Sequence, residues 1–411
     1  MSSLLRPTHT ILRASLLMFL LATTASLPAT AQTFTVLHYF TGAGDGGNPS
    51  SLLVNQHSLY GTAVMGGTGN YGTVFKMSQG RSGWALTTLY NFLDNDEAEP
   101  QNLFLGPDGR FYGTTLGSLG LYSGASIFSL TPPATPCRNV LCSWTQTQLT
   151  DFGALENISP ALVFDSSGNI YGTTVNGGGD GDYCPYEFGC GTFFELSPSN
   201  GGWTLNTIYD FLTSYFPNGV TPDDAGTFYG DTSQGGSSDY GVIFEFSPSG
   251  NSWSQTVLYN FSNGSDGGVP LAPLLRDTAG NLYGTTSSGG SGSAGTIFEL
   301  SPSAGGWVFN VLYNFPARSG YPSALSMDSA GNLYGTTRAG GLDYGTVFKL
   351  TPSNGSWTST LLHAFDRSDG ANPQTGIVFD NAGNLYGTTT YGGISGSCQG
   401  FGCGVVWEIT P

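Results

Sequence analysis

The sequence predicts an all-β fold, a seven-bladed β-propeller whose blades are four-stranded sheets. Three observations lead to it. The stretch DSAGNLYGTT, Asp328–Thr337, recurs in close copies along nearly the whole chain. The residues between the copies form short β-prone runs with no helical period, and the last copy lacks a run that the first residues can supply. A regular repeat of this kind indicates one ring of similar units.

A Tyr-Gly pair marks each of the seven copies, and consecutive pairs lie 51 to 59 residues apart. Because the spacing is regular, each copy is expected to form one structural unit. The tyrosines are Tyr60, Tyr112, Tyr171, Tyr229, Tyr283, Tyr334 and Tyr386.

One complete unit extends from Pro322 to Phe365 and contains four β-prone runs separated by turn residues. The runs are A (Ser323–Asp328), B (Asn332–Thr337), C (Gly345–Thr351) and D (Trp357–Phe365). Runs C and D are apolar on both faces, so neighbouring sheets must cover both faces of the blade. The repeated Tyr and the Trp that opens run D are expected to fill the space between blades.

The two ends of the chain are expected to complete one blade together. In six copies run D begins with a Trp eight residues before its Phe, whereas the seventh copy ends after run C at Pro411. The missing run has its counterpart in TFTVLHYF, Thr33–Phe40. Pairing of this strand into the last blade would close the ring and leave no exposed sheet edges.

Residues 1–31 have the features of a secretory signal peptide. Arg6 and Arg13 form a basic start, Leu16–Ala22 is a short apolar core, and Ala29–Ala31 offers a small-residue cleavage site. A retained N-terminal anchor is the alternative, although the apolar run is short for a membrane span. Residues 32–411 are interpreted as a single propeller domain with no membrane span, and a monomer is expected.

The charge balance excludes nucleic acid as a partner. The formal net charge is −17, and it becomes −19 when Arg6 and Arg13 are removed with the signal. Nucleic-acid affinity depends largely on basic side chains that neutralise phosphates. An exported, acidic protein has few basic groups with which to do so.

The six cysteines form three local pairs, which predict disulfide bonds in an oxidising compartment. A zinc site is the weaker alternative, because no histidines lie near and no segment holds four cysteines. The predicted bonds are Cys137–Cys142, Cys184–Cys190 and Cys398–Cys403.

Acids recur in the loops between run D and the next run A, four residues before the proline that opens run A. They are Asp45, Asp96, Glu156, Asp266 and Asp369. By analogy with other propellers these loops surround the mouth of the central channel, so the acids, together with Glu97, are candidate ligand-binding residues. Calcium is the cofactor that such oxygen clusters would suit. The simpler interpretation is that each acid shapes its own turn.

A second set of acids lies six residues before the repeated Tyr and is expected to have a turn role. Single departures from the repeat, namely His57, Asp231 and Arg338, are interpreted as drift. No recognised catalytic motif is present, and four histidines leave little for acid–base chemistry near neutral pH.

The units DGANP, GNLYGTT and GTVFKLTP, all found between Gly331 and Pro373, resemble those of the choice-of-anchor tandem repeat GloVer-containing proteins of bacteria. The likeness covers Gln32–Pro411. It implies an exported repeat protein, often with a C-terminal surface anchor. Because this chain ends at Pro411 directly after run C, a secreted or periplasmic location is expected instead.

Three functions remain open at this point. The first is a binding or scaffold module for a glycan or a cell-envelope protein, with no catalytic residue assigned. The alternative is a polysaccharide hydrolase or lyase that uses channel carboxylates. The third is a purely structural component of the cell envelope. An enzyme would bring two or three polar residues that are unique among the repeats into one pocket.

Overall fold

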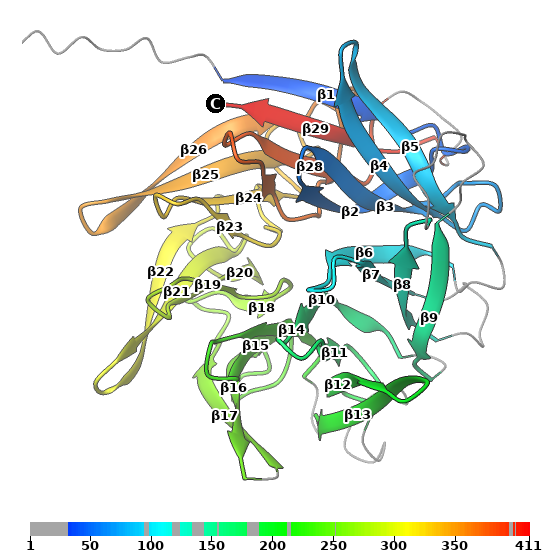
Figure 1. Cartoon of the computed structure of the whole chain (residues 1–411). Coiled ribbons are helices and arrows are strands. Elements are labelled where there is room, and N and C mark those ends of the chain that lie inside the picture. Colours follow the sequence, from blue (N-terminus) through cyan, green and yellow to red (C-terminus); the bar gives the residue numbers. More distant parts are fainter. Residues whose placement is uncertain are drawn as a thin grey trace, which may run out of the picture. The chain divides into compact units, whose positions relative to one another are not determined.

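The computed structural model describes residues 32–93, 98–116, 124–133, 144–153, 156–178, 189–211, 215–250, 252–393, 398 and 400–411. All regular elements of these residues are strands, and they pair into seven antiparallel sheets that follow one another around a ring (Figure 1). The predicted seven-bladed β-propeller is therefore confirmed. Within the described residues there is no helix that is long and apolar enough to cross a bilayer.

The first four blades each contain four strands that are consecutive in the sequence. Blade 1 contains β2 (Gly47–Asn55), β3 (Ser58–Met65), β4 (Thr73–Gly80) and β5 (Gly83–Asn91); blade 2 contains β6 (Pro100–Leu105), β7 (Phe111–Thr115), β8 (Ser126–Thr131) and β9 (Thr145–Asp151); blade 3 contains β10 (Ile158–Phe164), β11 (Ile170–Thr174), β12 (Thr192–Ser199) and β13 (Gly202–Asp210); blade 4 contains β14 (Pro217–Pro222), β15 (Phe228–Thr232), β16 (Val242–Ser249) and β17 (Ser252–Asn260).

The remaining blades have very short inner strands. Blade 5 contains β18 (Gly268–Pro270), β19 (Leu275–Arg276), β20 (Leu282–Ser288), β21 (Thr296–Ser303) and β22 (Gly306–Asn314); blade 6 contains β23 (Ser326–Met327), β24 (Leu333–Thr337), β25 (Thr346–Ser353) and β26 (Ser356–Ala364); blade 7 contains β27 (Val378–Phe379), β28 (Leu385–Thr389), β29 (Val405–Thr410) and β1 (Thr33–Tyr39). The short inner strands surround the centre of the ring and the long outer strands lie at its periphery (Figure 1).

In blades 5, 6 and 7 the inner strands are shorter than the predicted run A. In blade 6 the ladder between the inner and second strands covers only Ser326–Met327, where Ser323–Asp328 was expected. Pro322 has no N–H to donate, and the chain before it is in a left-handed conformation, with Tyr321 at φ 61°. In blade 1 the same disturbance shifts the register between Pro49 and Ser51.

The hairpin between runs A and B is held by the aspartate of the second acid set, as predicted. In blade 6 the Asp328 Oδ1 atom accepts from the N–H groups of Ala330 and Asn332, at 2.9 Å each. The Asp328 Oδ2 atom accepts from the Asn332 side chain at 2.7 Å and the Tyr334 hydroxyl at 3.0 Å. Gly331 completes the turn at φ 79°, which glycine adopts without strain. These acids therefore stabilise the turn and the repeated Tyr.

The repeated Tyr and the Trp of the next blade meet between blades, which confirms their predicted role. Tyr112 of blade 2 lies 6.3 Å from Trp203 of blade 3, measured between ring centroids. Tyr229 lies 5.7 Å from Trp307 in the same way. Edge-to-face pairs such as these add to the burial of the rings and fix the angle between neighbouring sheets.

In at least five repeats the proline that opens run A packs against a glycine of the preceding blade. A Cβ atom added to Gly345 of blade 6 would lie 2.6 Å from Pro373 Cδ of blade 7, and one added to Gly404 of blade 7 would lie 2.6 Å from Pro49 Cδ of blade 1. Only glycine leaves room for this approach. The Gly and the Pro of the repeat are therefore two halves of one contact between blades.

The residue before each of these prolines has a positive φ in six repeats, although a following proline disfavours helical conformations. The six are Asn48, Glu99, Phe216, Val269, Tyr321 and Asn372, with φ between 45° and 65°. Asparagine tolerates this region, whereas a β-branched residue does not. The strain is greatest at Val269.

Val269→Asn is expected to stabilise the protein by about 1 kcal/mol, because it relieves a left-handed β-branched residue. Asn48 and Asn372 already occupy the equivalent position. The reciprocal change Asn372→Val should lower the stability by a similar amount. Chemical denaturation of both variants measures the effect, and two shifts of the same sign would contradict it.

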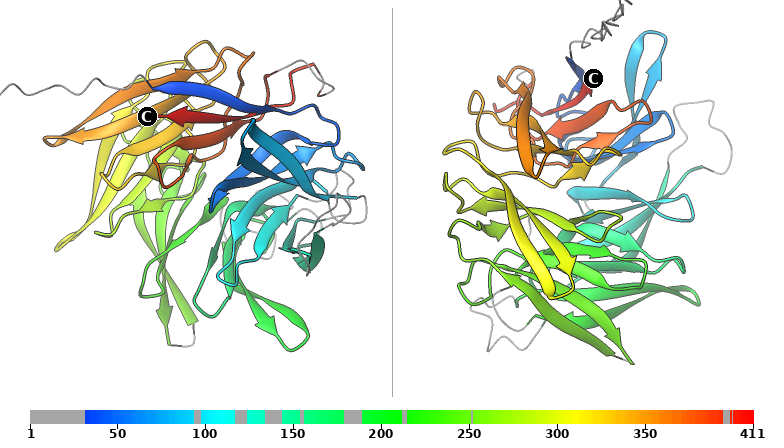
Figure 2. Two further views of the ribbon diagram at one scale, coloured as in Figure 1. Left: turned by 45° about the horizontal axis from the view of Figure 1, so that its top comes forward. Right: turned by 90° about the vertical axis from the view of Figure 1, so that its left-hand side faces the viewer.

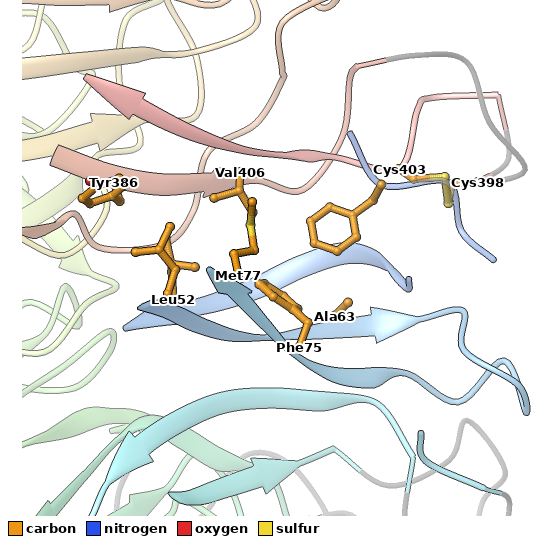
Figure 3. Packing of buried hydrophobic residues seen from close by; sticks show 10 residues of the cluster. Leu52, Ala63, Phe75, Met77, Tyr386, Cys398, Cys403 and Val406 are labelled. Atoms are coloured by element: carbon orange, nitrogen blue, oxygen red, sulfur yellow. A yellow bond between two sulfur atoms is a disulfide. The ribbon is translucent and has the colours of Figure 1, made fainter. Parts of the chain in front are cut away.

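Strand β1 completes the last blade and closes the ring, as predicted. It pairs antiparallel with β29, from Thr33 opposite Thr410 to Tyr39 opposite Val405, and the two strands lie side by side in all views (Figures 1 and 2). Blades 1 and 7 also share one apolar cluster (Figure 3), which contains Leu52 and Phe75 of blade 1 beside Tyr386 and Val406 of blade 7.

The disulfide Cys398–Cys403 is formed, which confirms one of the three predicted bonds. Both cysteines are buried beside the cluster that joins blades 1 and 7 (Figure 3). Cys190 is disulfide-bonded and buried, but its expected partner Cys184 lies outside the described residues. Cys137 and Cys142 also lie outside them, so these two bonds stay predictions.

Candidate functional site

The central channel is the principal cavity in the described part of the chain. Its volume is about 870 Å³. The lining comes from blades 1, 2, 5, 6 and 7, and it consists mainly of inner strands and of the segments that follow the YGTT motif. Ligand sites in proteins are commonly cavities of about 300 to 1,000 Å³, so the channel is large enough for a small ligand.

Three positions of the repeat supply the polar and aromatic lining at the mouth of the channel. They are the residue before the run A proline, the residue after it, and the residues that follow YGTT. The scaffold is nearly constant at the neighbouring positions, but these three change from copy to copy. They are occupied by Asn48, Glu99, Gln101, Tyr321, Arg338, Gln374, Thr390 and Tyr391 among the lining residues.

A chain of side-chain hydrogen bonds connects blades 6 and 7 at the mouth. The Gln374 amide donates through Nε2 to Thr390 Oγ1 at 3.2 Å. Its Oε1 atom accepts a hydrogen bond from Arg338 Nη2. Desolvation lowers the pKa of Arg338 below its ordinary value, but a guanidinium remains charged at any physiological pH. The amide is therefore oriented with its oxygen toward a cation.

Glu99 is the carboxylate that lines the channel in the described residues. Its backbone N–H donates to Tyr71 of blade 1 at 3.0 Å, and its carbonyl accepts from Leu116 of its own blade at 3.2 Å. The backbone of Glu99 is thus fixed at the junction of two blades. Burial raises the pKa of Glu99 above its ordinary value.

Exposed aromatic rings stand beside these polar groups. Tyr321 is 53% exposed, Tyr391 is 37% exposed and Phe401 is 59% exposed. The rings of Tyr391 and Phe401 lie 6.1 Å apart, and both line a smaller cavity of about 260 Å³ with Asn48. Large exposed rings next to amides and a cation form an amphipathic surface, which is unusual in a scaffold that buries most of its aromatic residues.

The described acids of the first set form turns, and none of the four lies among the described residues that line the channel. Asp45 Oδ2 accepts from His38 Nε2 at 3.0 Å and from the Thr41 N–H at 3.1 Å. Asp369 Oδ2 has the same relation to His363 Nε2 at 2.8 Å. Asp266 Oδ2 accepts from the Tyr259 hydroxyl at 3.1 Å. An aromatic residue of run D therefore holds Asp45, Asp266 and Asp369.

These bonds affect the ionisation of two of the acids. Burial acts to raise the pKa of Asp45, and hydrogen bonds from His38 and Thr41 outweigh it, so the pKa lies below its ordinary value. Asp266 shows the same balance, with the Ser262 hydroxyl and N–H as its principal donors. At Glu156 the pKa is raised by burial. Asp96 and Glu97 lie outside the described residues.

The calcium hypothesis stays a prediction. Within the described residues no group of three His, Cys, Asp or Glu side chains lies close enough together to hold a metal ion. If the acidic loop of residues 93–100 supplies the ligands, millimolar calcium should raise the melting temperature of the wild type. The rise should be smaller in the double variant Asp96→Asn with Glu97→Gln. Equal shifts, or none, would assign a turn role to these acids.

Asp231 is the departure from the repeat that the structure makes most unusual. It replaces the first Thr of YGTT in blade 4 and is fully buried. Asn218 Nδ2 donates to Asp231 Oδ1 at 2.8 Å and to the Pro270 carbonyl of blade 5 at 2.9 Å, while the Oδ2 atom has no partner among the described residues. Burial raises the pKa of Asp231 to about 8, against the effect of the Asn218 bond.

A family model named Gloeobacter/Verrucomicrobia repeat matches residues 23–186 and 158–401. The chain belongs to this repeat family. The match confirms the resemblance that the DGANP, GNLYGTT and GTVFKLTP units indicated. No curated protein matches the chain.

Solved structures similar to this member of the Gloeobacter/Verrucomicrobia repeat family share its fold at low sequence identity. The periplasmic gluconolactonase of Pseudomonas aeruginosa has a TM-score of 0.52 and 14% identity, over 80% of this chain and 87% of that one. A protein of Bacteroides uniformis, provisionally assigned as a 6-phosphogluconolactonase, has a TM-score of 0.50 and 14% identity, over 76% of this chain and 84% of that one. The extracellular domain of a provisionally assigned one component system of B. thetaiotaomicron has a TM-score of 0.53 and 12% identity, over 91% of this chain and 39% of that one.

Sequence reasoning about this family member identified the repeat but not the lining of the mouth. Tyr321, Gln374 and Glu99 do not recur among the copies, so the repeat pattern does not distinguish them. The informative signal in the sequence is variation among the copies. Positions beside the constant proline, which the fold directs to the channel, differ among the seven copies.

Proposed function

We propose that the protein is an exported binding module that takes a saccharide at the mouth of its central channel. The observation that carries this proposal is that the exposed ring of Tyr321 lines the same cavity of about 870 Å³ as the amides of Gln374 and Gln101. A sugar ring offers an apolar C–H face and a rim of hydroxyls. An aromatic ring matches the first by stacking, and amides match the second by hydrogen bonding.

Export is supported by the chain itself. Residues 1–31 have the pattern of a secretory signal peptide. The disulfide Cys398–Cys403 is typical of a protein that matures in an oxidising compartment. A soluble extracytoplasmic propeller would meet the polysaccharides of the cell surface or of the medium.

Tyr321→Asn is expected to weaken saccharide binding about tenfold. A stacked sugar removes about 60 Å² of apolar surface from water, which corresponds to about 1.5 kcal/mol. Asparagine occupies the same position as Asn48 and Asn372 and tolerates the positive φ, so the variant should fold. A glycan array on purified residues 32–411 would identify a ligand, and calorimetry would then compare the variants.

Tyr240→Asn is the matched control. Tyr240 is 37% exposed but is not among the residues that line the channel, so its replacement should leave the affinity unchanged. Failure of the wild-type protein to bind any glycan would contradict the proposed function. Equal affinity of the Tyr321→Asn variant and the wild type would place the ligand elsewhere.

A polysaccharide hydrolase or lyase is the second candidate, and Glu99 is the observation that favours it. A carboxyl group with a raised pKa in a cavity is a suitable general acid. Glycosidases need a second carboxyl group, and Glu99 is the carboxylate that the described channel lining provides. A reducing-sugar assay that detects product with the wild type and none with Glu99→Gln would establish catalysis.

A further inference from the structure

We infer that the saccharide is acidic and that Arg338 binds its carboxylate. This inference rests on the proposed function, and it names the chemical class of the ligand. Uronic acids combine a ring suited to Tyr321 with a carboxylate suited to a guanidinium.

Arg338 is set apart from the equivalent positions of the other repeats. The residue that follows YGTT or its variant is neutral in all the other copies, namely Val64, Leu116, Val175, Ser233, Ser287 and Thr390. The fold therefore does not require a charge there. Arg338 and Glu99 are the charged residues among the described lining of the channel, and they stand on blades 6 and 2.

The guanidinium of Arg338 has no counter-ion in the described structure. Its side chain forms no salt bridge, and Gln374 is its hydrogen-bond partner among the described residues. Among the described arginines, Arg110 is the one with a salt bridge, to Asp108 at 3.5 Å. Arg338 differs from the others in that it lines the channel and meets a neutral amide there. A guanidinium has five N–H donors, so one bond to Gln374 leaves the others for a ligand.

The position of Arg338 is fixed before any ligand arrives. Thr390 fixes the Gln374 amide at 3.2 Å, and the amide oxygen then holds Arg338 Nη2. Preorganisation of this kind reduces the entropy lost on binding. Because the backbone N–H of Arg338 donates to the Tyr321 carbonyl at 3.1 Å, the cation and the exposed ring come from directly adjacent backbone. A ring over Tyr321 would thus place a carboxylate substituent near Arg338.

The test compares uronate oligosaccharides with their methyl esters, which have the same shape without the charge. An array of galacturonate, guluronate, mannuronate and glucuronate oligomers and their esters is applied to the wild type, Arg338→Ser and Arg81→Ser. Ser287 shows that the repeat accepts serine at this position. Arg81 is an exposed arginine in the hairpin between β4 and β5 and is not among the channel residues.

At least one acid is expected to bind the wild type at least about tenfold more tightly than its ester. Arg338→Ser should remove this preference, so that an acid and its ester bind the variant with equal affinity, and Arg81→Ser should retain it. Equal binding of acids and esters would overturn the inference but leave the proposed function standing, as would an Arg338→Ser variant that keeps the preference. Binding of neutral glycans, with no binding of acidic ones, would also overturn the inference and leave the proposed function standing. Absence of binding to any glycan would overturn both.

Discussion

A chain that lacks Thr33–Phe40 is expected to lose most of its stability and to aggregate. The deletion removes β1 and leaves β29 as an unpaired edge in blade 7, where it can pair with other chains. Each buried apolar side chain that is lost costs about 1.5 to 3 kcal/mol. Thermal unfolding followed by circular dichroism, with light scattering, measures both effects.

The residues of this segment contact three blades, which explains the size of the effect. Phe34 stacks on His363 of blade 6, with ring centroids 3.5 Å apart. Phe40 is 1% exposed and lies 5.3 Å from Phe75 of blade 1. The backbone of the segment pairs with blade 7. Its removal therefore opens the ring at the junction of its first and last repeats.

A single substitution separates burial from chain shortening. Phe40→Ala should destabilise the protein by about 3 to 5 kcal/mol, the usual cost of emptying a buried phenylalanine site. Phe401→Ala is the matched control, because Phe401 is 59% exposed and should contribute little. If the shortened chain melts like the wild type, the strand is not needed for closure.

Asp231→Thr is expected to remove a pH dependence of stability from the protein. In the wild type the free energy of unfolding should fall by about 1.4 kcal/mol per pH unit as the pH rises from about 4 to about 8, because one proton is bound in the folded state and released on unfolding. The variant should lack this contribution. The free energy of unfolding of the variant, minus that of the wild type, should therefore increase as the pH rises toward 8.

The sign follows from the direction of the pKa shift. Burial raises the pKa of Asp231 from an ordinary 3.8 to about 8. The folded state therefore favours the protonated acid, and the stabilising effect of the proton is present at low pH and lost as the pH approaches 8. Threonine supplies a permanent neutral hydroxyl. In blade 5 the equivalent Thr285 Oγ1 donates to the Ser323 carbonyl of blade 6 at 3.3 Å.

Urea denaturation at several pH values between 5 and 9 tests this prediction. The slope of the free energy of unfolding against pH is measured for the wild type and for Asp231→Thr, and the difference between the two slopes is the contribution of Asp231. Glu99 and Glu156, whose pKa values are also raised by burial, contribute equally to both slopes and cancel. Asp224→Thr replaces an exposed aspartate and should leave the slope as it is. Parallel curves for the wild type and Asp231→Thr would show that Asp231 does not bind a proton in this range.

The strands, the blades and the closure of the ring could be predicted from the sequence, because each of these depends on contacts that recur in every copy. Asp328 holds a hairpin that its own sequence neighbours form. Tyr229 packs against Trp307 of the next repeat, and Tyr112 packs against Trp203 in the same way. The partner of the last blade was also visible, since Thr33–Phe40 has the pattern of the missing run. Local pairing and a regular period determine such features.

The candidate site was decided by the tertiary structure, because its residues share neither a segment nor a period. Arg338 and Gln374 belong to different blades and meet only where the blades converge on the channel. The recurring acids illustrate the converse. Asp45 and Asp369 recur at one position of the repeat, and His38 and His363 hold them in their turns. Those histidines become their partners only when run D folds beside the next loop. A period in the sequence thus determined the scaffold. The proposed site consists of positions at which the period fails, and only the closed ring brings those together.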